Sequence, residues 1–442
     1  MNPDGTIYGK ILLVYGTKVK ADDGSNLLIR TQFANWPKNK LAQIHSTADI
    51  DGYGDYCSRY FRLSDCDRRY GRIFMILREH IFKYTKQEKI CDAFSKSNDD
   101  KNSSIFRSVL KKLKIYISRF IVDSGFWEVI FVVRLSEDMK QFIEDFNPDI
   151  IYCQGYSLSF TLLPLLISKY YDLPICFQTT DDWPNERYKK SPVSYLVKKK
   201  ARELITKAET RMSFGAKMTE EYKRRYKVEF ENTYHLDDIN RFDVVKKCVQ
   251  SDFTIIYTGL LGLKRYEAIQ DLLQAVRNIE ELKCKVSIRI YTNGIPVDMP
   301  EELIKADEIT YQELPRHDEL PKILKKASLL FLPESFNVDR SWLEYSISTK
   351  SHLYMMSGKP ILVYGPKYSG TIEYASQEKW AFVVNEKNIS KIEEKVRFVL
   401  LGGTGVEDQI NRARNVALRN HDIFQGRMKF ERIIADAAKK KI

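Results

Sequence analysis

Short runs of consecutive apolar residues alternate with stretches of helical periodicity along almost the whole chain. In the first half, the strand-like runs cover residues 7–15, 149–153, 174–178 and, more weakly, 210–213. Unbroken apolar runs of this length are typical of parallel strands that are covered on both faces. One amphipathic helix is predicted over residues 106–121, and a second ends at Phe146 with Ser136 as its N-cap.

The same pattern starts again in the second half. Strand-like runs are predicted at residues 253–257, 286–291, 329–332, 360–364 and 381–384, with helices at 266–280, 318–327, 343–357, 389–401 and two more within 407–442. Residues 234–251 lack clear periodicity and are predicted to be a linker. We therefore predict an α/β protein with two Rossmann-like, doubly wound β/α domains that face each other across a cleft. The predicted boundaries are 1–235, 252–405 and 406–442.

The composition adds a strong positive charge to this picture. The 442 residues carry a formal net charge of +12. Basic clusters at 111–114, 198–202 and 439–441 suit a polyanion or an anionic membrane face, but they are equally consistent with a solvated surface. There is no zinc-finger spacing and no aromatic–glycine RNA-binding signature, so nucleic acid is not an expected partner.

Apolar segments and cysteines exclude some further classes of protein. The longest apolar runs are far below the roughly 20 residues that cross a bilayer, and no signal peptide is predicted. The seven cysteines are scattered and include no C-x-x-C pair. This pattern indicates a reducing compartment and argues against a disulfide framework or a structural metal site.

The first segment with candidate chemistry is Y-T-G-L-L-G-L-K-R, residues 257–265, which reads as strand, glycine turn, cations and helix. Gly259 and Gly262 would let backbone N–H groups approach a phosphate closely. Lys264 and Arg265 could neutralise a diphosphate. The alternative is a tight β–α turn whose cations are merely solvated.

The second segment covers residues 348–365, where a helix is predicted to end at Gly358 and Pro360 to open a strand. If that helix begins near residue 348, Thr349 and Lys350 lie where exposed N–H groups favour an anion. The alternatives are an ordinary exposed lysine and, for His352, a surface histidine or one with its hydrogen bonds satisfied.

These strings resemble one family of enzymes. Residues 348–362 resemble the S-x-K-x-x-E-Y-x-x-x-G-K-P-V-L segment of bacterial group-1, family 4-like GT-B glycosyltransferases. Further similar pieces occur in the family's order. They are the P-D-I-I-Y string at 148–152, the D-D-W-P loop at 181–184, the L-x-x-A-x-x-x-x-x-P stretch at 324–333, and Asn420, His421, Asp422 and Phe430 of the terminal helix that crosses back onto the N-terminal domain.

The resemblance implies a nucleotide-diphosphate-sugar donor held by the C-terminal domain and an acceptor held by the N-terminal domain, without metal or cofactor. It implies that Lys264 or Arg265 neutralises the leaving phosphates, that Lys350 lies near the donor, and that Glu313 and Leu314 lie in the loop that meets the nucleobase. Either Asp181 or Asp182 would contact the donor sugar or the acceptor hydroxyl, as the catalytic candidates. The loop with Gly24 and Ser25 would close over the cleft.

One departure from the family pattern concerns the E-x7-E pair, whose second glutamate contacts ribose. Tyr345 and Leu353 occupy its two positions. The neighbouring Glu344 and His352 are the candidates to replace them, although a one-residue offset points about 100° around a helix.

The expected function is transfer of a sugar from a nucleotide sugar to a glycan or lipid-linked acceptor in cell-surface polysaccharide synthesis. The resemblance favours a retaining, hexosyltransferase-like enzyme. A cytoplasmic location is expected, and the basic amphipathic stretch 106–121 favours a peripheral contact with the inner face of the plasma membrane. Two alternatives stay open, a nucleotide-sugar epimerase or hydrolase on the same fold and a degenerate, non-catalytic nucleotide-sugar-binding protein.

Overall fold

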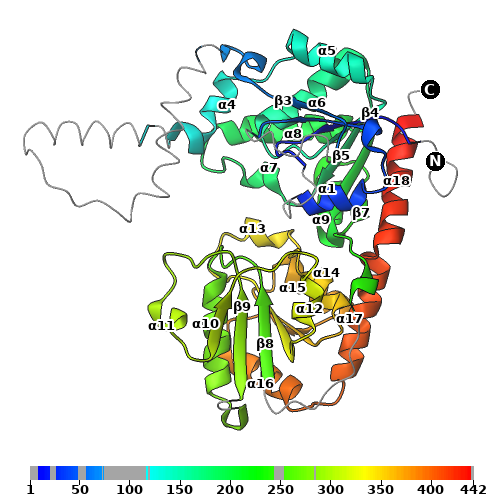
Figure 1. Ribbon diagram of the computed structural model, residues 1–442. Coiled ribbons are helices and arrows are strands. Elements are labelled where there is room, and N and C mark those ends of the chain that lie inside the picture. Colours follow the sequence, from blue (N-terminus) through cyan, green and yellow to red (C-terminus); the bar gives the residue numbers. More distant parts are fainter. Residues whose placement is uncertain are drawn as a thin grey trace, which may run out of the picture.

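A computed structural model describes residues 8–19, 26–47, 56–71, 73, 116–117, 120–242, 253–282 and 285–439. Figure 1 shows two β/α units, one above the other, joined near the right-hand side of the view. Most of the predicted amphipathic helix at 106–121 lies outside the described residues, and so does the second half of the predicted linker, from residue 243 onward. No helix among the described residues combines the length and the apolarity that a membrane span requires.

The N-terminal sheet has seven parallel strands in the order β3-β2-β1-β4-β5-β6-β7. They are β1 (Ile11–Val14), β2 (Leu41–His45), β3 (Arg59–Arg62), β4 (Ile150–Cys153), β5 (Ile175–Thr179), β6 (Thr210–Phe214) and β7 (Glu231–Thr233). The C-terminal sheet has six parallel strands in the order β10-β9-β8-β11-β12-β13. These are β8 (Phe253–Thr258), β9 (Val286–Tyr291), β10 (Ile309–Gln312), β11 (Leu329–Pro333), β12 (Ile361–Tyr364) and β13 (Phe382–Val384).

Both sheets reverse their strand order beside their first strand, between β1 and β4 and between β8 and β11. This is the doubly wound arrangement, in which ligands bind outside the carboxyl ends of the strands at the reversal point. The predicted fold class, two Rossmann-like β/α domains, is confirmed.

Helices cover both faces of each sheet. In the N-terminal domain they are α1 (Leu27–Gln32), α4 (Phe126–Ile130), α5 (Glu137–Phe146), α6 (Leu158–Tyr171), α7 (Trp183–Glu186), α8 (Val193–Lys207) and α9 (Gly215–Tyr226). In the second half they are α10 (Arg265–Arg277), α11 (Glu301–Ile304), α12 (Leu320–Leu324), α13 (Ser341–Glu344), α14 (Ser351–Met356), α15 (Gly370–Glu378), α16 (Ile389–Leu400), α17 (Val406–Asn420) and α18 (Ile423–Lys439). Ser136 caps α5 as predicted, since its side chain accepts from the Met139 N–H.

The helix predicted over residues 343–357 is not continuous. The structure has α13 and α14 instead, and residues 345–350 form an irregular segment between them. Lys350 occupies the N-cap position of α14, without a side-chain capping bond, and the helix ends before Gly358, whose φ of +69° is the left-handed conformation expected after a helix. The start of this helix is therefore at residue 351, not at residue 348.

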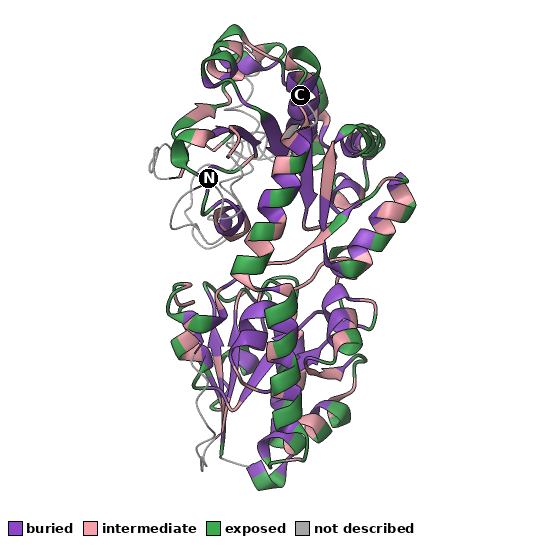
Figure 2. Ribbon diagram, turned by 90° about the vertical axis from the view of Figure 1, so that its right-hand side faces the viewer, coloured by how far each residue is buried: buried purple, intermediate pink, exposed green. Residues whose placement is uncertain are grey.

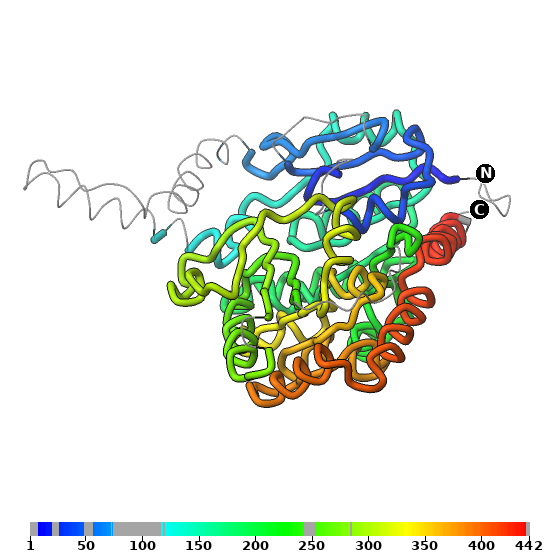
Figure 3. Tube along the Cα trace, turned by 60° about the horizontal axis from the view of Figure 1, so that its bottom comes forward, coloured from blue at the N-terminus to red at the C-terminus, as the bar shows by residue number. Residues whose placement is uncertain are grey.

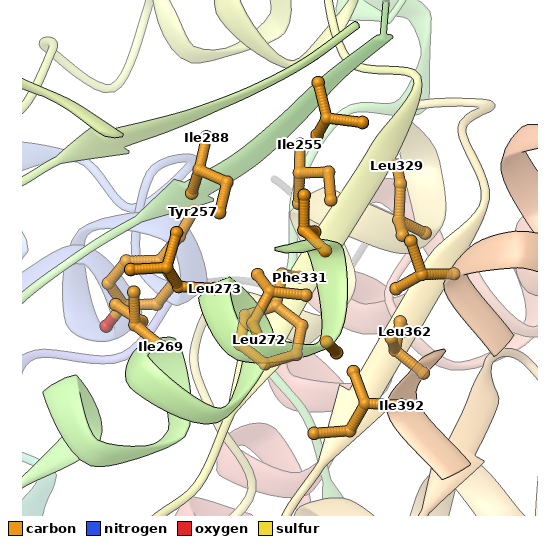
Figure 4. Packing of buried hydrophobic residues seen from close by; sticks show 14 of the residues in the cluster. Ile255, Tyr257, Ile269, Leu272, Leu273, Ile288, Leu329, Phe331, Leu362 and Ile392 are labelled. Carbon is orange, nitrogen blue, oxygen red and sulfur yellow. The ribbon is translucent and has the colours of Figure 1, made fainter. Parts of the chain in front are cut away.

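One hydrophobic core of the C-terminal domain lies between the sheet and helices α10 and α16, and Figure 4 shows some of its members. Ile255 and Tyr257 of β8 point to the same side of the sheet, toward Leu272 of α10. Burial of one such aliphatic side chain contributes roughly 1.5–3 kcal/mol to stability. This packing fixes the start of α10, and hence Arg265, against the end of β8.

The last helix returns to the N-terminal sheet. Figures 1 and 3 both show α18, in red, alongside the N-terminal domain. Phe430 packs edge-on against Phe33, with 4.8 Å between ring centroids, and Asn35 Nδ2 donates to Glu431 Oε1 at 3.2 Å. The chain thus passes between the domains twice, after β7 and between α17 and α18.

Candidate functional site

Arg265 and a buried glutamate meet at the carboxyl edge of the C-terminal sheet. Arg265 is the first residue of α10, and Glu334 follows β11, so the two lie on either side of the strand reversal. Arg265 Nη2 is 3.2 Å from Glu334 Oε2. The other carboxylate oxygen, Oε1, accepts from Thr371 Oγ1 at 3.0 Å. Glu334 is only 3% exposed, so this pairing holds the guanidinium in place at the edge of the sheet.

Lys350 reaches the same point from the segment before α14. Its side chain crosses the backbone of Gly259, because a Cβ built on Gly259 would lie 2.2 Å from Lys350 Cε. The ammonium Nζ lies 5.6 Å from the centroid of the Tyr257 ring. Burial and then the positive charge of Arg265 lower the pKa of Lys350, the Glu334 carboxylate opposes both effects, and the resulting pKa is about 8. Lys350 is therefore still mostly protonated at neutral pH.

The turn after β8 makes room for this lysine. Gly259 has a φ of +136°, which side chains other than glycine rarely adopt. Its N–H donates to Tyr291 O at 2.8 Å, and the Tyr257 hydroxyl donates to Leu260 O at 2.7 Å. The strand end and the turn are thus fixed by hydrogen bonds on both sides of the glycine.

The predicted partner Lys264 is not part of this cluster. Leu263 and Lys264 both have left-handed backbones, with φ of +56° and +54°. The Lys264 side chain is half exposed, and its Nζ lies 3.9 Å from Glu267 Oε1 on the outer turn of α10. Gly262 borders open space, since a Cβ there would meet nothing within 4 Å. Two of the four residues predicted in this segment, Gly259 and Arg265, therefore lie close to Lys350, whereas Gly262 and Lys264 do not.

Two cations and one buried carboxylate leave this point with a net positive charge. An Arg guanidinium can bind phosphate oxygens in a bidentate manner, and a partly desolvated Lys adds a point charge. Such preorganised positive groups stabilise negative charge that develops on a leaving phosphate. The arrangement is chemically suited to an anionic group.

Asp182 and Asp181 have different roles on the facing edge of the N-terminal sheet. Asp182 is 4% exposed and fully engaged, because it accepts from Arg225 Nη1 at 2.6 Å, Tyr222 OH at 3.0 Å and Asn185 Nδ2 at 2.9 Å. These contacts tie α7 to α9, so the geometry gives Asp182 a structural role.

Asp181, by contrast, faces the other domain. Ser346 Oγ, from the C-terminal domain, donates to Asp181 Oδ1 at 3.2 Å. Tyr156 OH and Thr180 Oγ1 lie 3.3 and 3.1 Å from Oδ2. Glu186 lies in the same charged neighbourhood, where burial and then the charges of Asp181 and Asp182 raise its pKa to about 8.

The remaining predicted donor-site residues include Thr349, Glu313 and Leu314, and the predicted cleft loop contains Gly24 and Ser25. Thr349 is exposed and precedes Lys350 outside any helix, so an anion at a helix start there is not supported. Glu313 is exposed in the loop after β10, and the adjacent Leu314 donates its N–H to Asn293 Oδ1 at 3.2 Å. Gly24 and Ser25 lie outside the described residues.

The candidates to replace the missing glutamates are placed elsewhere. His352 is 2% exposed and stacks between His235 and His421, with 5.7 Å between centroids on each side. Glu344 pairs with Arg340 on α13. Neither is joined by a described contact to Arg265 or Lys350.

The two motif positions themselves are packing positions. Leu353 is 6% exposed and belongs to a second hydrophobic cluster of the C-terminal domain, apart from the one beneath α10 and α16. Tyr345 packs against the N-terminal core beneath Arg225, with 5.8 Å from the guanidinium carbon to the ring centroid. Because α13 and α14 are separate helices, the seven residues between these positions do not place them on one helix face.

Glu334 was missed by the sequence interpretation. The signal that could have found it is a carboxylate directly after an apolar parallel strand, next to the strand reversal. Glu186 carried no such signal, because its altered pKa depends on neighbours brought together only by folding.

No family model matches the chain, and no curated protein sequence matches it. Solved structures do match over nearly the full length. HepE of Anabaena, in complex with UDP and glucose, shares 10% identity with a TM-score of 0.61, covering 97% of this chain and 99% of that one. Sucrose-phosphate synthase of Thermosynechococcus elongatus shares 11% identity with a TM-score of 0.60, over 96% and 98% of the two chains.

A third match is the α,α-trehalose 6-phosphate synthase of Burkholderia multivorans, with 9% identity and a TM-score of 0.60, covering 99% of this chain and all of that one (100%). Identities this low establish a shared fold and do not by themselves establish a shared activity. The chain has the two-domain GT-B fold found in these glycosyltransferases.

Proposed function

We propose that this protein is a glycosyltransferase that moves a sugar from a nucleotide-diphosphate donor, held by the C-terminal domain, to an acceptor at the edge of the N-terminal domain. The observation that carries the proposal is the convergence of Arg265 and Lys350 at the strand reversal, with Gly259 between strand and helix. The bound UDP in HepE, a protein of the same fold, supports a nucleotide sugar as the ligand.

In the proposed reaction the bond between the sugar and the diphosphate breaks, and negative charge grows on the departing phosphate. Arg265, oriented by Glu334, and Lys350 stabilise this charge. Loss of one such donor typically lowers kcat by about 10²–10³-fold. Protein cations take the place of a metal in this scheme, so we expect activity to persist in EDTA.

Asp181 is the proposed contact for the acceptor hydroxyl or the donor sugar, because its carboxylate faces the C-terminal domain. We propose a retaining, hexosyltransferase-like reaction on the basis of the sequence resemblance. In such a reaction the leaving phosphate helps to take the acceptor proton, and Asp181 orients the acceptor. An inverting enzyme would instead use Asp181 as general base.

The proposed acceptor is a glycan or a lipid-linked glycan in cell-surface polysaccharide synthesis, reached from the cytoplasmic face of the membrane. Exposed apolar side chains on the N-terminal domain support a membrane contact: Tyr70, Ile73, Phe120, Val129 and Ile130. Liposome flotation with and without anionic lipid tests this part. No recovery with either kind of liposome would remove it.

The donor site is tested by a thermal-shift panel of UDP-, GDP- and ADP-sugars. A ligand that binds only the folded protein raises the melting temperature. We expect the shift to be lost or weakened in Arg265→Ala and Lys350→Met and retained in Lys264→Ala, which serves as the matched control. Unchanged shifts in all three variants would contradict the proposed donor site.

Two alternatives predict different products. An epimerase or hydrolase converts the donor without any acceptor, so product analysis with donor alone distinguishes it from a transferase. A non-catalytic protein binds the nucleotide sugar but never glycosylates an acceptor, and measured turnover would exclude it.

A further inference from the structure

One irregular segment of the C-terminal domain, residues 345–350 between α13 and α14, reaches across to the N-terminal domain. Figures 1 and 2, which view the molecule from directions 90° apart, show the two domains one above the other, and α13 lies at the upper end of the lower domain in Figure 1. The segment ends at Lys350, which forms the donor cluster together with Arg265 and Glu334. One short piece of chain therefore connects the N-terminal domain with the donor cluster.

The ring of Tyr345, at the start of this segment, is packed into the N-terminal domain and not into its own. It lies against the hydrophobic cluster that includes Met218 and Tyr222 of α9. Two cations of the same helix flank it, since the Arg225 guanidinium carbon lies 5.8 Å and Lys217 Nζ lies 5.9 Å from the ring centroid. Positive groups over an aromatic face are attracted by the ring quadrupole. Both packing and charge therefore hold the ring against α9.

The next two residues continue the contact with the N-terminal domain. Ser346 Oγ donates to Asp181 Oδ1 at 3.2 Å. Ile347 lies against Gly215, the first residue of α9, where an added Cβ would be 2.4 Å from Ile347 Cδ1. Gly215 has a φ of +76°, so the absence of a side chain permits both this backbone and the close approach of Ile347. Three consecutive residues of one domain thus lie on the other.

The other end of the segment is tied to the donor cluster. Ser348 N–H donates to Thr371 Oγ1 at 2.9 Å. The Thr371 hydroxyl donates in turn to Glu334 Oε1 at 3.0 Å, and Glu334 pairs with Arg265. Because the hydroxyl accepts from Ser348, its single proton is left for the carboxylate. A continuous series of contacts therefore runs from the N-terminal domain to both donor cations.

The two covalent connections between the domains are joined to each other. Asp237 N–H donates to His421 O at 3.0 Å, and Ile423 N–H donates to Asp237 O at 3.1 Å. These bonds fix one place where the domains meet and leave the angle between the domains to other contacts. Ion pairs also cross between the domains, Lys189 with Asp339 and Lys217 with Glu373, but pairs this exposed are weak. The partly buried ring of Tyr345 is therefore the stronger anchor.

We propose that Tyr345 is a positioning residue of the transfer reaction: by anchoring residues 345–347 in the N-terminal domain, it sets the place of Asp181 relative to Arg265 and Lys350. This inference rests on the proposed function, in which Asp181 orients the acceptor and the two cations receive the departing diphosphate. The reacting groups must be aligned across the two domains, and a misplacement of about 1 Å can lower a rate about 10²-fold. The ring of Tyr345 makes the contacts that hold it, so phenylalanine should replace it.

The test compares Tyr345→Ala with Tyr345→Phe in the full chain. Trp342→Ala is the matched control, because it removes an aromatic ring of α13 that is 52% exposed. Calorimetric titration with UDP measures the donor site, and the rate of UDP release from UDP-glucose measures turnover. We expect Tyr345→Ala to lower kcat about 10- to 100-fold, while its UDP affinity stays within about twofold of the unmodified protein. Tyr345→Phe and Trp342→Ala should match the unmodified protein in both measurements.

Hydrogen exchange of the unliganded protein tests the anchor without any reaction. Loss of the ring should free the segment to open locally, so the amides of residues 341–350 should exchange faster in Tyr345→Ala and at the unmodified rate in Tyr345→Phe. If Tyr345→Ala fails to fold, Gly215→Ala loosens the same contact from the other domain, because its Cβ would push against Ile347. It should give the same exchange pattern and the same fall in kcat.

Three results would overturn the proposal. They are unchanged exchange of residues 341–350 in Tyr345→Ala, unchanged kcat in that variant, and equal losses in the alanine and phenylalanine variants. A fall in UDP affinity as large as the fall in kcat would also refute it, because Tyr345 would then act on the donor cluster alone. If the unmodified protein neither binds UDP nor turns over UDP-glucose, that result counts against the proposed transferase, and the exchange pattern decides the anchor by itself.

Discussion

Replacing Gly259 by alanine gives a sharp test of the donor site, because the new Cβ enters space that Lys350 occupies. The Cβ would lie 2.2 Å from Lys350 Cε and 3.0 Å from Nζ, both well inside contact distance. The backbone at this residue, with φ of +136°, adds strain of about 1–3 kcal/mol for a non-glycine residue. Since the lysine end is flexible, we expect the side chain to move away and the sheet to stay intact.

The expected effect on donor binding follows from the lost contact. A hydrogen bond to a charged group contributes about 1.5–3 kcal/mol, so moving the ammonium away from the phosphates should weaken UDP binding by about 10- to 150-fold. Calorimetric titration with UDP measures this change. Thermal unfolding without ligand measures the backbone strain separately.

Gly262→Ala is the matched control, because it makes the same chemical change three residues along the same loop. A Cβ there would meet nothing within 4 Å, and this glycine has no positive φ. We expect its UDP affinity to stay within about twofold of the unmodified protein, a difference below 0.5 kcal/mol. The reasoning is refuted if both alanine variants bind UDP equally well, or if Gly262→Ala is the more damaging.

Three further predictions concern pH and individual side chains. Lys350 has a pKa of about 8, so its positive charge is lost as pH rises through that value. UDP affinity should therefore fall between pH 7 and roughly pH 9 in the unmodified protein. The affinity of Lys350→Met should not fall in this way, and calorimetric titration with UDP at each pH would show the difference. Burial lowers the pKa of His421 to about 4, below its unfolded value of 6.5, so its contribution to stability is present above pH 6.5 and is lost as pH falls toward 4. The full shift corresponds to about 3 kcal/mol, and urea unfolding at pH 7 and roughly pH 5 should show a smaller loss in His421→Asn than in the unmodified protein. Asp182→Asn should destabilise the fold by about 1.5–3 kcal/mol, because Arg225 loses one of its two carboxylate partners and keeps Glu221, and thermal unfolding would measure the loss. Asp181→Asn should lower kcat/KM with little change in melting temperature.

The sequence pattern predicted the strands that carry a continuous apolar signal. Strands β4, β5, β8 and β12 are buried on both faces, and their runs of apolar residues require such a position. Strand β3, Arg59–Arg62, was not predicted, because it is a largely exposed edge strand whose ends are arginines. Edge strands of this kind are recognised only by the neighbour with which they pair.

The candidate site was only partly predictable for a similar reason. Residue type and spacing indicated Arg265, and the family resemblance indicated Lys350; the two meet although they are 85 positions apart in the sequence. The same reasoning included Lys264, whose side chain is turned outward by two consecutive left-handed residues. The split between α13 and α14 was also invisible, since residues 345–350 retain apolar positions that fit a helix. Backbone conformation at single residues is set by tertiary packing, and local composition does not encode it.

The hydrogen bonds between Asp237 and residues 421 and 423 restrict how the two halves of the molecule can move. Two connections that are tied together at one place act as a single axis, so relative motion reduces to rotation about that axis. Contacts that lie across the lobes away from it, such as the 2.7 Å ion pair of Lys189 with Asp339, must separate when the lobes rotate apart. Opening and closing should therefore show up first as breaking and re-forming of that pair, while the backbone bonds at the axis persist.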